Sequence, residues 1–158
     1  MPAVTVSRKN NTTPKVRRNQ VTTGQVFAKI IKGDVSRKLY AALGSNGKHY
    51  SVNLQTGELA STTKETSQVA VVGTFKAKIT RELDRSQYRQ RLRNEVRNGE
   101  LFMVKGDSSN KIYGHLGRLR DGKHMSFNMG SKDVASTQNG RSTVYVIGEY
   151  RLDAEVTQ

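Results

Sequence analysis

The chain of 158 residues is strongly basic and poor in apolar side chains: 27 Lys and Arg stand against 13 Asp and Glu, the formal net charge is +14, and 34% of residues are hydrophobic. Such a chain can build one domain or two very small ones, but no large buried architecture. Cysteine is absent, which excludes disulfides, thiolate metal sites and a cysteine nucleophile. No apolar run approaches the roughly 20 residues of a membrane span, and the start lacks a secretory signal, so we expect a soluble protein made inside a cell.

The charge is the strongest functional signal in the composition. A field of this sign attracts polyanions before any contact forms, so nucleic acid is the expected partner and an anionic membrane surface the weaker one.

Residues 1–20 are expected to form a disordered basic arm. They contain Arg8, Lys9, Lys15, Arg17 and Arg18, no acidic residue, and many Asn and Thr. Too little apolar side chain is present to offset the entropy of ordering, and an arm of this kind often folds onto phosphates.

Two segments, 21–79 and 99–158, repeat the same phrases. TGQVF matches NGELF, KGD and GKH occur in both copies, and VAVVGTF matches VYVIGEY, mostly at the 75-residue offset that separates Phe27 from Phe102. We infer a tandem duplication. The copies differ in charge, because the first has 8 basic and 3 acidic residues (+5) and the second 8 basic and 7 acidic (+1).

Each copy is predicted to contain five short strands between Gly and Asn turns. We expect strands near 25–31, 38–43, 48–54, 58–62 and 68–79, and near 100–104, 111–116, 123–129, 133–137 and 143–152. The predicted fold is mainly β: two tandem small SH3-like (Tudor/KOW-like) barrels, with an OB-like barrel as the alternative.

Residues 80–98 are predicted to form a basic α-helix that joins the two barrels. Leu83, Tyr88, Leu92 and Val96 make a loose apolar stripe, and Gly99 is the expected end of the helix. The remaining faces are rich in arginine, whose guanidinium matches phosphate oxygens in pairs, although a charged helix face is often only solvated.

The third strand of each copy keeps its polar face. His49, Ser51 and Asn53 recur as His124, Ser126 and Asn128, whereas the apolar face between them changes. One interpretation is a groove that donates hydrogen bonds to phosphate or sugar oxygens, with Tyr40 and Tyr113 as stacking surfaces. The other is structural: the Asn caps a turn, and His and Ser hold the KGD loop, which itself has the composition of a turn.

The candidate nucleic-acid-binding residues are the basic side chains of the arm, first copy and helix, with the repeated polar face and its equivalents in the second copy. They are Arg8, Lys9, Lys15, Arg17 and Arg18; Lys32, Lys38, Lys48, His49, Ser51 and Asn53; Arg85, Arg89 and Arg93; and Lys105, Lys111, Lys123 and His124.

Catalysis and metal binding are not expected. Asp34 with His49, and Asp107 with His124, are the acid/base pairs common to both copies, which leaves a nuclease as a remote alternative. No metalloprotease, hydrolase or phosphate-loop motif occurs, no metal or cofactor is predicted, and nothing indicates sequence-specific reading of bases.

The phrases YSVNLQTGEL, from Tyr50, and VAVVGTF, from Val69, resemble short β-modules of small basic early proteins from tailed bacteriophages. The likeness covers the first copy better than the second, where GSKDV replaces QTGEL. The resemblance implies a protein of the infected bacterial cytoplasm, associated with the nucleoid, that binds DNA and alters transcription or nucleoid packing.

The function predicted from the sequence is binding of duplex nucleic acid, DNA rather than RNA, through backbone phosphates and without sequence preference. Three alternatives stay open: an RNA or ribosome binder, a module whose second copy binds a host protein such as RNA polymerase or a nucleoid protein, and a component of the virion.

Overall fold

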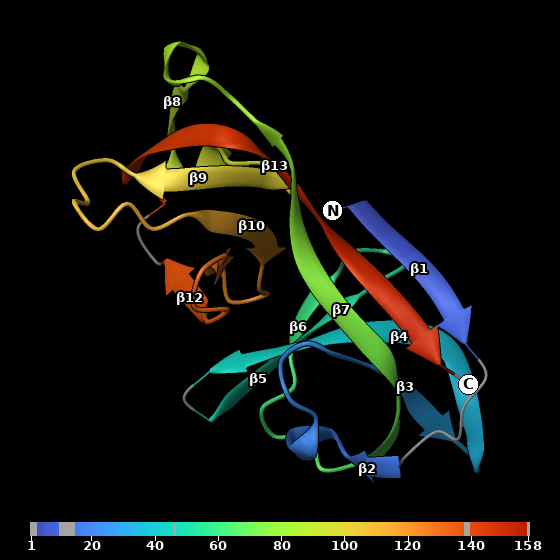
Figure 1. Cartoon of the computed structure of the whole chain (residues 1–158). Helices are drawn as coiled ribbons and strands as arrows, with labels where there is room; N and C mark the ends of the chain where they lie inside the picture. The colour runs from blue at the N-terminus through green and yellow to red at the C-terminus, as the bar shows by residue number, and fades with distance from the viewer. Residues whose placement is uncertain (1–2, 10–14, 46, 138–139, 158) are drawn as a thin grey trace. The chain divides into compact units, whose positions relative to one another are not determined.

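The protein is mainly β, as the turn-punctuated sequence predicts. The computed structural model describes residues 3–9, 15–45, 47–137 and 140–157, and side chains over 15–44, 47–137 and 140–156. Its strands form strongly curled antiparallel sheet, and short 3-10 turns are the only helical elements in that part of the chain (Figure 1). The chain divides into two compact units, which we describe separately.

The N-terminal unit is formed by Val4–Lys76 together with Leu152–Gln158. Its strands follow the order β7-β3-β4-β5-β6, with β2 paired to β7 and β1 to β13. A core cluster of Val21, Phe27, Ala42 and Val69 lies inside the curl. The elements are β1 (Ala3–Lys9), β2 (Lys15–Arg17), η1 (Arg18–Gln20), β3 (Gln25–Ile31), β4 (Asp34–Ser45), β5 (Lys48–Asn53), β6 (Leu59–Ser61) and β7 (Gln68–Glu82).

The C-terminal unit is formed mainly by Ala77–Arg151. Its strands follow the order β12-β11-β10-β9-β13, with β8 paired to β13. The core cluster of Val96, Phe102, Val144 and Val146 is equivalent to that of the first unit. The elements are η2 (Arg85–Gln87), β8 (Arg89–Leu92), η3 (Arg93–Glu95), β9 (Glu100–Val104), β10 (Tyr113–Arg118), β11 (His124–Asn128), β12 (Val134–Thr137) and β13 (Thr143–Thr157).

The two long strands, β7 and β13, are neighbours in the sheet and each contributes to both units (Figure 1). Residues 77–82 of β7 belong to the C-terminal unit, and residues 152–157 of β13 belong to the N-terminal unit. Each repeat therefore ends in a strand that completes the unit of the other repeat, and the sequence ranges 21–79 and 99–158 do not describe the units.

The predicted helix over 80–98 is wrong. β7 continues to Glu82, and Arg89–Leu92 forms β8, which pairs with Val146–Thr143 of β13. The opposite edge of the same β13 residues is occupied by β9, so β8 satisfies backbone groups that would otherwise face solvent. The pairing of β8 with β13 outweighs the weak helical periodicity of the segment.

The predicted disordered arm is also corrected where residues 1–20 are described. Ala3–Lys9 forms β1, and Lys15–Arg17 pairs with Ala70–Gln68 of β7. β2 and η1 occupy in the first repeat the places that β8 and η3 occupy in the second. Both repeats therefore begin before residues 21 and 99, where the repeated sequence phrases place their starts. Residues 10–14 of the expected arm lie outside the described residues.

The KGD segment forms a turn in both repeats, as its composition predicts. In the first repeat Lys32 (φ 50°) and Gly33 (φ 82°) both have left-handed backbone and join β3 to β4 by a two-residue connection, the arrangement that favours a twisted hairpin. In the second repeat Gly106 has φ 84°, and the carboxylate of Asp107 accepts hydrogen bonds from Ser109 N and Oγ. There an irregular loop replaces the hairpin tip.

Close approach of β7 and β13 requires glycine at equivalent positions. A Cβ at Gly73 would overlap Glu155 O, and one at Gly148 would overlap Arg81 O. We predict that Gly73→Ala and Gly148→Ala each lower the free energy of unfolding by about 2–3 kcal/mol, because backbone must shift to admit the methyl group. Urea denaturation measures this. Gly130→Ala, whose Cβ meets only Asn128 Oδ1 at 3.4 Å, is the matched control, and equal stability of all three variants would contradict the account.

Candidate nucleic-acid interface

Each unit is built around a buried arginine that stacks on an aromatic pair. In the N-terminal unit the guanidinium of Arg18 lies 4.5 Å from the ring centre of Phe27, which stacks on Tyr40 at 5.4 Å. In the C-terminal unit Arg93 lies 4.5 Å from Phe102, which stacks on Tyr113 at 5.5 Å. We call each stack of Arg, Phe and Tyr a ladder. The two ladders occupy equivalent positions in the two repeats, so the arginine is a structural element of the repeat.

Each arginine also donates a hydrogen bond to a backbone carbonyl of a strand, β5 in the N-terminal unit and β11 in the C-terminal unit. Arg18 Nη2 donates to Tyr50 O at 2.7 Å, and Arg93 Nη2 donates to Met125 O at 3.3 Å. Arg18 is 0% exposed and Arg93 is 1% exposed. Burial lowers the pKa of Arg93 to about 10 and lowers that of Arg18, yet both remain charged at neutral pH.

These two arginines are removed from the predicted interface. A guanidinium that is enclosed by the core cannot reach a phosphate without unfolding its surroundings. The prediction for these two residues failed because the basic composition of residues 1–20 and 80–98 does not show which arginine faces the core.

A histidine distinguishes the second ladder from the first. His115 takes the place of Ala42, and Arg93 Nη1 donates to His115 Nδ1 at 2.9 Å. Because a guanidinium can only donate, Nδ1 must be unprotonated and the imidazole neutral. Burial, followed by the charge of Arg93, lowers the pKa of His115 to about 3. Tyr150 Oη donates to His115 O at 2.6 Å and fixes the strand there.

The first ladder lacks this partner. Nε and Nη1 of Arg18 are buried without a hydrogen bond in the described structure, whereas in the second ladder Nε of Arg93 is the guanidinium nitrogen left so. The same fold therefore holds a well-bonded arginine in one unit and a poorly bonded one in the other.

The repeated polar face is largely structural. Asn53 Oδ1 accepts from Gln55 N and Thr56 N, and Asn128 Oδ1 accepts from Gly130 N and Ser131 N, which confirms that the Asn caps a turn. Ser51, Ser126 and His124 are buried, and His49 is half-buried. Ser51 and His124 are therefore withdrawn as surface contacts. Identity of the two faces follows from the fold they share.

The exposed basic side chains gather at different places. The clearest is the β3–β4 ribbon, which we define as residues 29–38. Its side chains are exposed on both faces from Ile31 to Lys38 except for Ser36, which is half-buried. Lys32 and Lys38 were predicted as contacts from the sequence; Lys29 and Arg37 were not. Within the described part of the chain, no ion pair involves Lys32, Arg37 or Lys38.

A second basic segment runs from the end of β7 through η2 into β8, and we call it the arginine arm (residues 81–91). Arg81, Arg85 and Arg89 are exposed, and Arg89 Nη2 lies 3.6 Å from Glu100 Oε2. Figure 1 shows this connection extending away from β9 and β13. Arg85 and Arg89 are therefore exposed, but Arg85 begins the 3-10 turn η2 and Arg89 begins β8, so the two do not share an α-helix.

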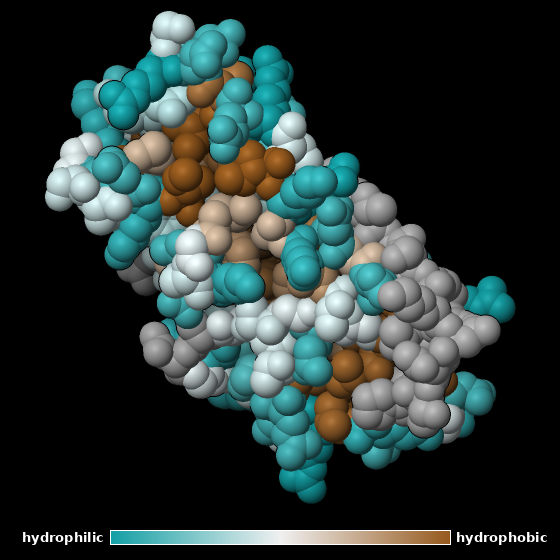
Figure 2. All heavy atoms as spheres, in the orientation of Figure 1, coloured by the Kyte–Doolittle hydropathy of each residue, from teal (hydrophilic) through white to brown (hydrophobic). Residues whose placement is uncertain are grey.

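The other predicted residues are dispersed. Lys15 and Arg17 are exposed on β2, Lys48 lies at the opposite end of β4 from Lys32, and Arg8 and Lys9 lie on β1 with side chains outside the described part. Lys105 and Lys111 are exposed on the β9–β10 loop, and Lys123 Nζ lies 3.6 Å from Asp121 Oδ2. On the face drawn in Figure 2, hydrophilic side chains surround separate hydrophobic patches.

The acid/base pair of the first repeat is not assembled. Asp34 pairs with Ile31 at one end of β4, and His49 pairs with Gly44 near the other end, on the order of 30 Å away along the strand. Among the described residues, no group of three or more His, Asp or Glu side chains is placed to hold a metal ion. No helix found there is long and apolar enough to cross a membrane.

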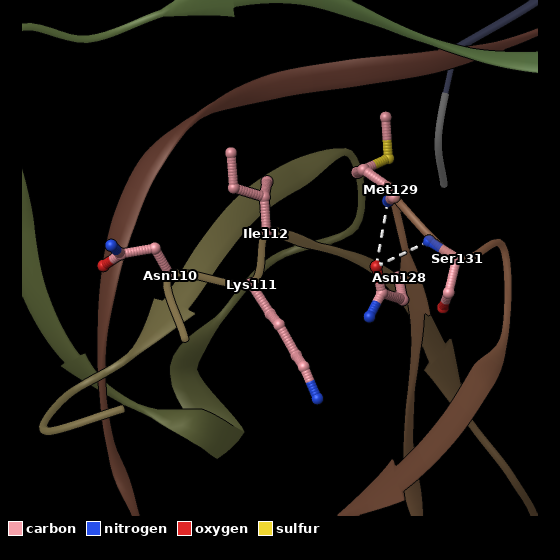
Figure 3. Close-up of a pocket in the computed structure, with 7 residues that line it drawn as sticks. Asn110, Lys111, Ile112, Asn128, Met129 and Ser131 are labelled. Carbon is pink, nitrogen blue, oxygen red and sulfur yellow. Dashed lines mark hydrogen bonds between the residues drawn. The ribbon is translucent and has the colours of Figure 1, made fainter. Parts of the chain in front are cut away.

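A shallow pocket of about 470 Å³ lies beside β10 in the C-terminal unit. Asn110, Lys111 and Ile112 line one side, and the turn from Asn128 to Ser131 lines the other (Figure 3). The Asn128 oxygen is occupied by the two backbone donors of its turn, which leaves Lys111 as the charged group of the pocket.

Comparison with protein-family models, with curated proteins and with solved structures finds no match to this chain. The resemblance to bacteriophage β-modules therefore stays a prediction, and the function must be argued from the residues themselves.

We predict that Arg93→Met destabilises the protein more than Arg18→Met, by about 1–2 kcal/mol. The reason is that Arg93→Met leaves two buried acceptors, His115 Nδ1 and Met125 O, without a donor, whereas Arg18→Met leaves one, Tyr50 O. Thermal and urea unfolding of the two variants measure the difference. Both variants should bind duplex DNA with the salt dependence of the wild type; a reduced slope for either would return that arginine to the interface.

We predict that His115 makes the protein less stable in mild acid. Its pKa is lower in the folded protein than in the unfolded chain, so below pH ~6.5 the unfolded chain binds a proton that the folded protein does not. Above pH 6.5 the neutral imidazole of His115 therefore costs the folded protein no stability. Below pH 6.5 the free energy of unfolding falls by about 1.4 kcal/mol per pH unit as the pH falls towards 3.

His115→Asn provides the control, because its amide oxygen accepts the Arg93 hydrogen bond but does not titrate. Urea unfolding at pH 7, 6, 5 and 4 should show a shallower decline for His115→Asn than for the wild type. Parallel declines would show that His115 is already protonated in the fold or titrates normally.

Proposed function

We propose that this protein binds duplex DNA through backbone phosphates, without sequence preference, and that the β3–β4 ribbon is its principal contact. The observation that carries the proposal is the ribbon itself: four basic side chains, Lys29, Lys32, Arg37 and Lys38, accompany one acidic residue, Asp34, on a hairpin exposed on both faces.

The geometry of the ribbon suits duplex DNA. A two-stranded antiparallel ribbon can enter a groove of B-DNA, where the phosphates of both strands flank it. Cations on both of its faces can then contact phosphates on both sides of a groove. In the register Ile30↔Val35, residues 35 and 37 lie on one face, and residues 34 and 38 on the other.

The arginine arm is a second contact in this proposal. Arg81 and Arg85 provide guanidinium groups that match phosphate oxygens in pairs. The repeated aromatic rings support duplex over single-stranded nucleic acid, because Tyr40 and Tyr113 stack on core phenylalanines and are half-buried. A base-stacking platform needs open ring faces.

We further propose that each unit is a small barrel of the SH3-like class. Five strands in a curled antiparallel sheet around one small core support this assignment. In such barrels the hairpins project from the closed core, which makes them natural sites for variation between copies.

We predict that duplex DNA binding weakens about a thousandfold between 50 and 200 mM salt, as expected if about six phosphates are neutralised. The triple substitution Lys32→Ala, Arg37→Ala and Lys38→Ala should lower the slope of log K against log salt by about 3, because three phosphates are then no longer neutralised. Fluorescence anisotropy with matched duplex DNA, single-stranded DNA and duplex RNA measures both.

The control for this experiment removes the same charge elsewhere. Lys64→Ala, Lys76→Ala and Arg120→Ala change three exposed cations outside the ribbon and should alter the slope far less. Equal losses in both triple variants would mean that the net charge acts diffusely. Preference for duplex RNA would favour the RNA-binding alternative, and equal weak binding to every polyanion would overturn the proposal.

A further inference from the structure

The tip of the β3–β4 ribbon carries apolar side chains where a purely electrostatic contact needs none. Ile31 is 58% exposed and Val35 is 44% exposed. They flank the Lys32–Gly33 turn, beyond the core cluster of the unit. Branched apolar side chains at the end of a basic hairpin suit a partner that offers both negative charge and apolar surface.

The two side chains project from opposite faces of the ribbon. Ile31 pairs with Asp34, and Ile30 pairs with Val35, so Ile31 and Val35 lie on opposite sides of the sheet. The tip is therefore apolar above and below. A single apolar patch on a protein or lipid surface would cover only one of these faces, whereas a gap between two layers covers both.

The equivalent loop of the second repeat has no projecting hairpin with apolar side chains on both faces. The chain between Phe102 and Gly106 is two residues shorter than that between Phe27 and Gly33, and Val104, the equivalent of Ile31, is 38% exposed. Asp107 and Ser109 close that loop by hydrogen bonds, and no hairpin projects. The apolar tip thus accompanies the repeat with the larger basic excess.

We propose that Ile31 and Val35 form a wedge that enters the minor groove and inserts between adjacent base pairs of duplex DNA. Stacked bases present apolar faces above and below such a wedge, and the phosphates that border the groove meet Lys32, Arg37 and Lys38. Insertion unstacks the step and kinks the duplex by roughly 20–90°. Steps that unstack easily, such as TA and CA, are the preferred places. The inference rests on the proposed binding of duplex DNA.

The test uses the full-length chain and a short duplex with 2-aminopurine at a TA step and a dye at each end. At saturating protein in low salt, the wild type should raise 2-aminopurine fluorescence severalfold and increase energy transfer between the ends. Ile31→Ser with Val35→Ser should leave both signals at the level of free DNA while the salt slope of binding stays unchanged.

The matched control is Val104→Ser with Leu92→Ser. These residues are each 38% exposed in the C-terminal unit, and their substitution should leave unstacking and bending as in the wild type. All four sites are exposed, so thermal unfolding should be little changed, and this is measured for each variant.

The outcomes separate the two proposals. Steep salt-dependent binding by the wild type without unstacking overturns the wedge and leaves phosphate binding intact. Unstacking by the Ile31→Ser/Val35→Ser variant also overturns the wedge. Absence of duplex binding overturns both proposals. Sedimentation of the protein alone gives the remaining outcome: a dimer that this variant abolishes would overturn the wedge by making the tip an interface between copies of the chain.

Discussion

Burial of one guanidinium in each unit constrains the rest of the structure. An arginine enclosed by a small core must have its charge stabilised there, and here a phenylalanine face and a sheet carbonyl do so. The stacked Phe and Tyr then come from adjacent strands, β3 with β4 and β9 with β10, and the carbonyl comes from β5 or β11. The arginine thereby determines which strands surround the core. Its own position depends on the 3-10 turns η1 and η3, which follow β2 and β8.

The strands between Gln25 and Glu82 and between Glu100 and Thr157 were largely predictable from the sequence, whereas β1, β2, β8 and the buried arginines were not. Alternating apolar residues between Gly and Asn turns predicted strands at 25–31 and 48–54, and the structure has β3 at Gln25–Ile31 and β5 at Lys48–Asn53, because period-2 alternation reports a half-buried strand directly. The buried arginines carry no such pattern. The available signal was the pair Arg18-Asn19-Gln20-Val21 and Arg93-Asn94-Glu95-Val96, which have the same 75-residue offset as the rest of the duplication. Its neglect allowed a helix and a disordered arm to be assigned to the equivalent segments.

Divergence between the repeats lies partly inside the cores and partly at the hairpins. Inside, His115 and Tyr150 replace Ala42 and Phe75, and Gly114 provides space for the larger ring, since a Cβ there would lie 2.7 Å from Tyr150 Cε1. The second unit has thus acquired a more complete hydrogen-bond network around its arginine. Outside, the first repeat has the longer ribbon and the larger basic excess, so one copy has specialised its core bonding and the other its surface.

Composition alone does not show which basic residues lie together on the surface. Of the basic residues predicted to bind phosphate, Arg18 and Arg93 are buried in the cores, Lys48 lies at the far end of β4 from the ribbon, and Lys123 lies beside Asp121 at a turn of the C-terminal unit. The sequence could locate Lys32 and Lys38 because the KGD turn marks a hairpin tip, but the exposure of Ile31 and Val35 depends on how far the hairpin extends beyond the core. That length is set by the two residues that the first repeat has before KGD and the second does not. A change of two residues in a connecting hairpin is tolerated easily by the fold, and here it converts a closed loop into a projecting ribbon.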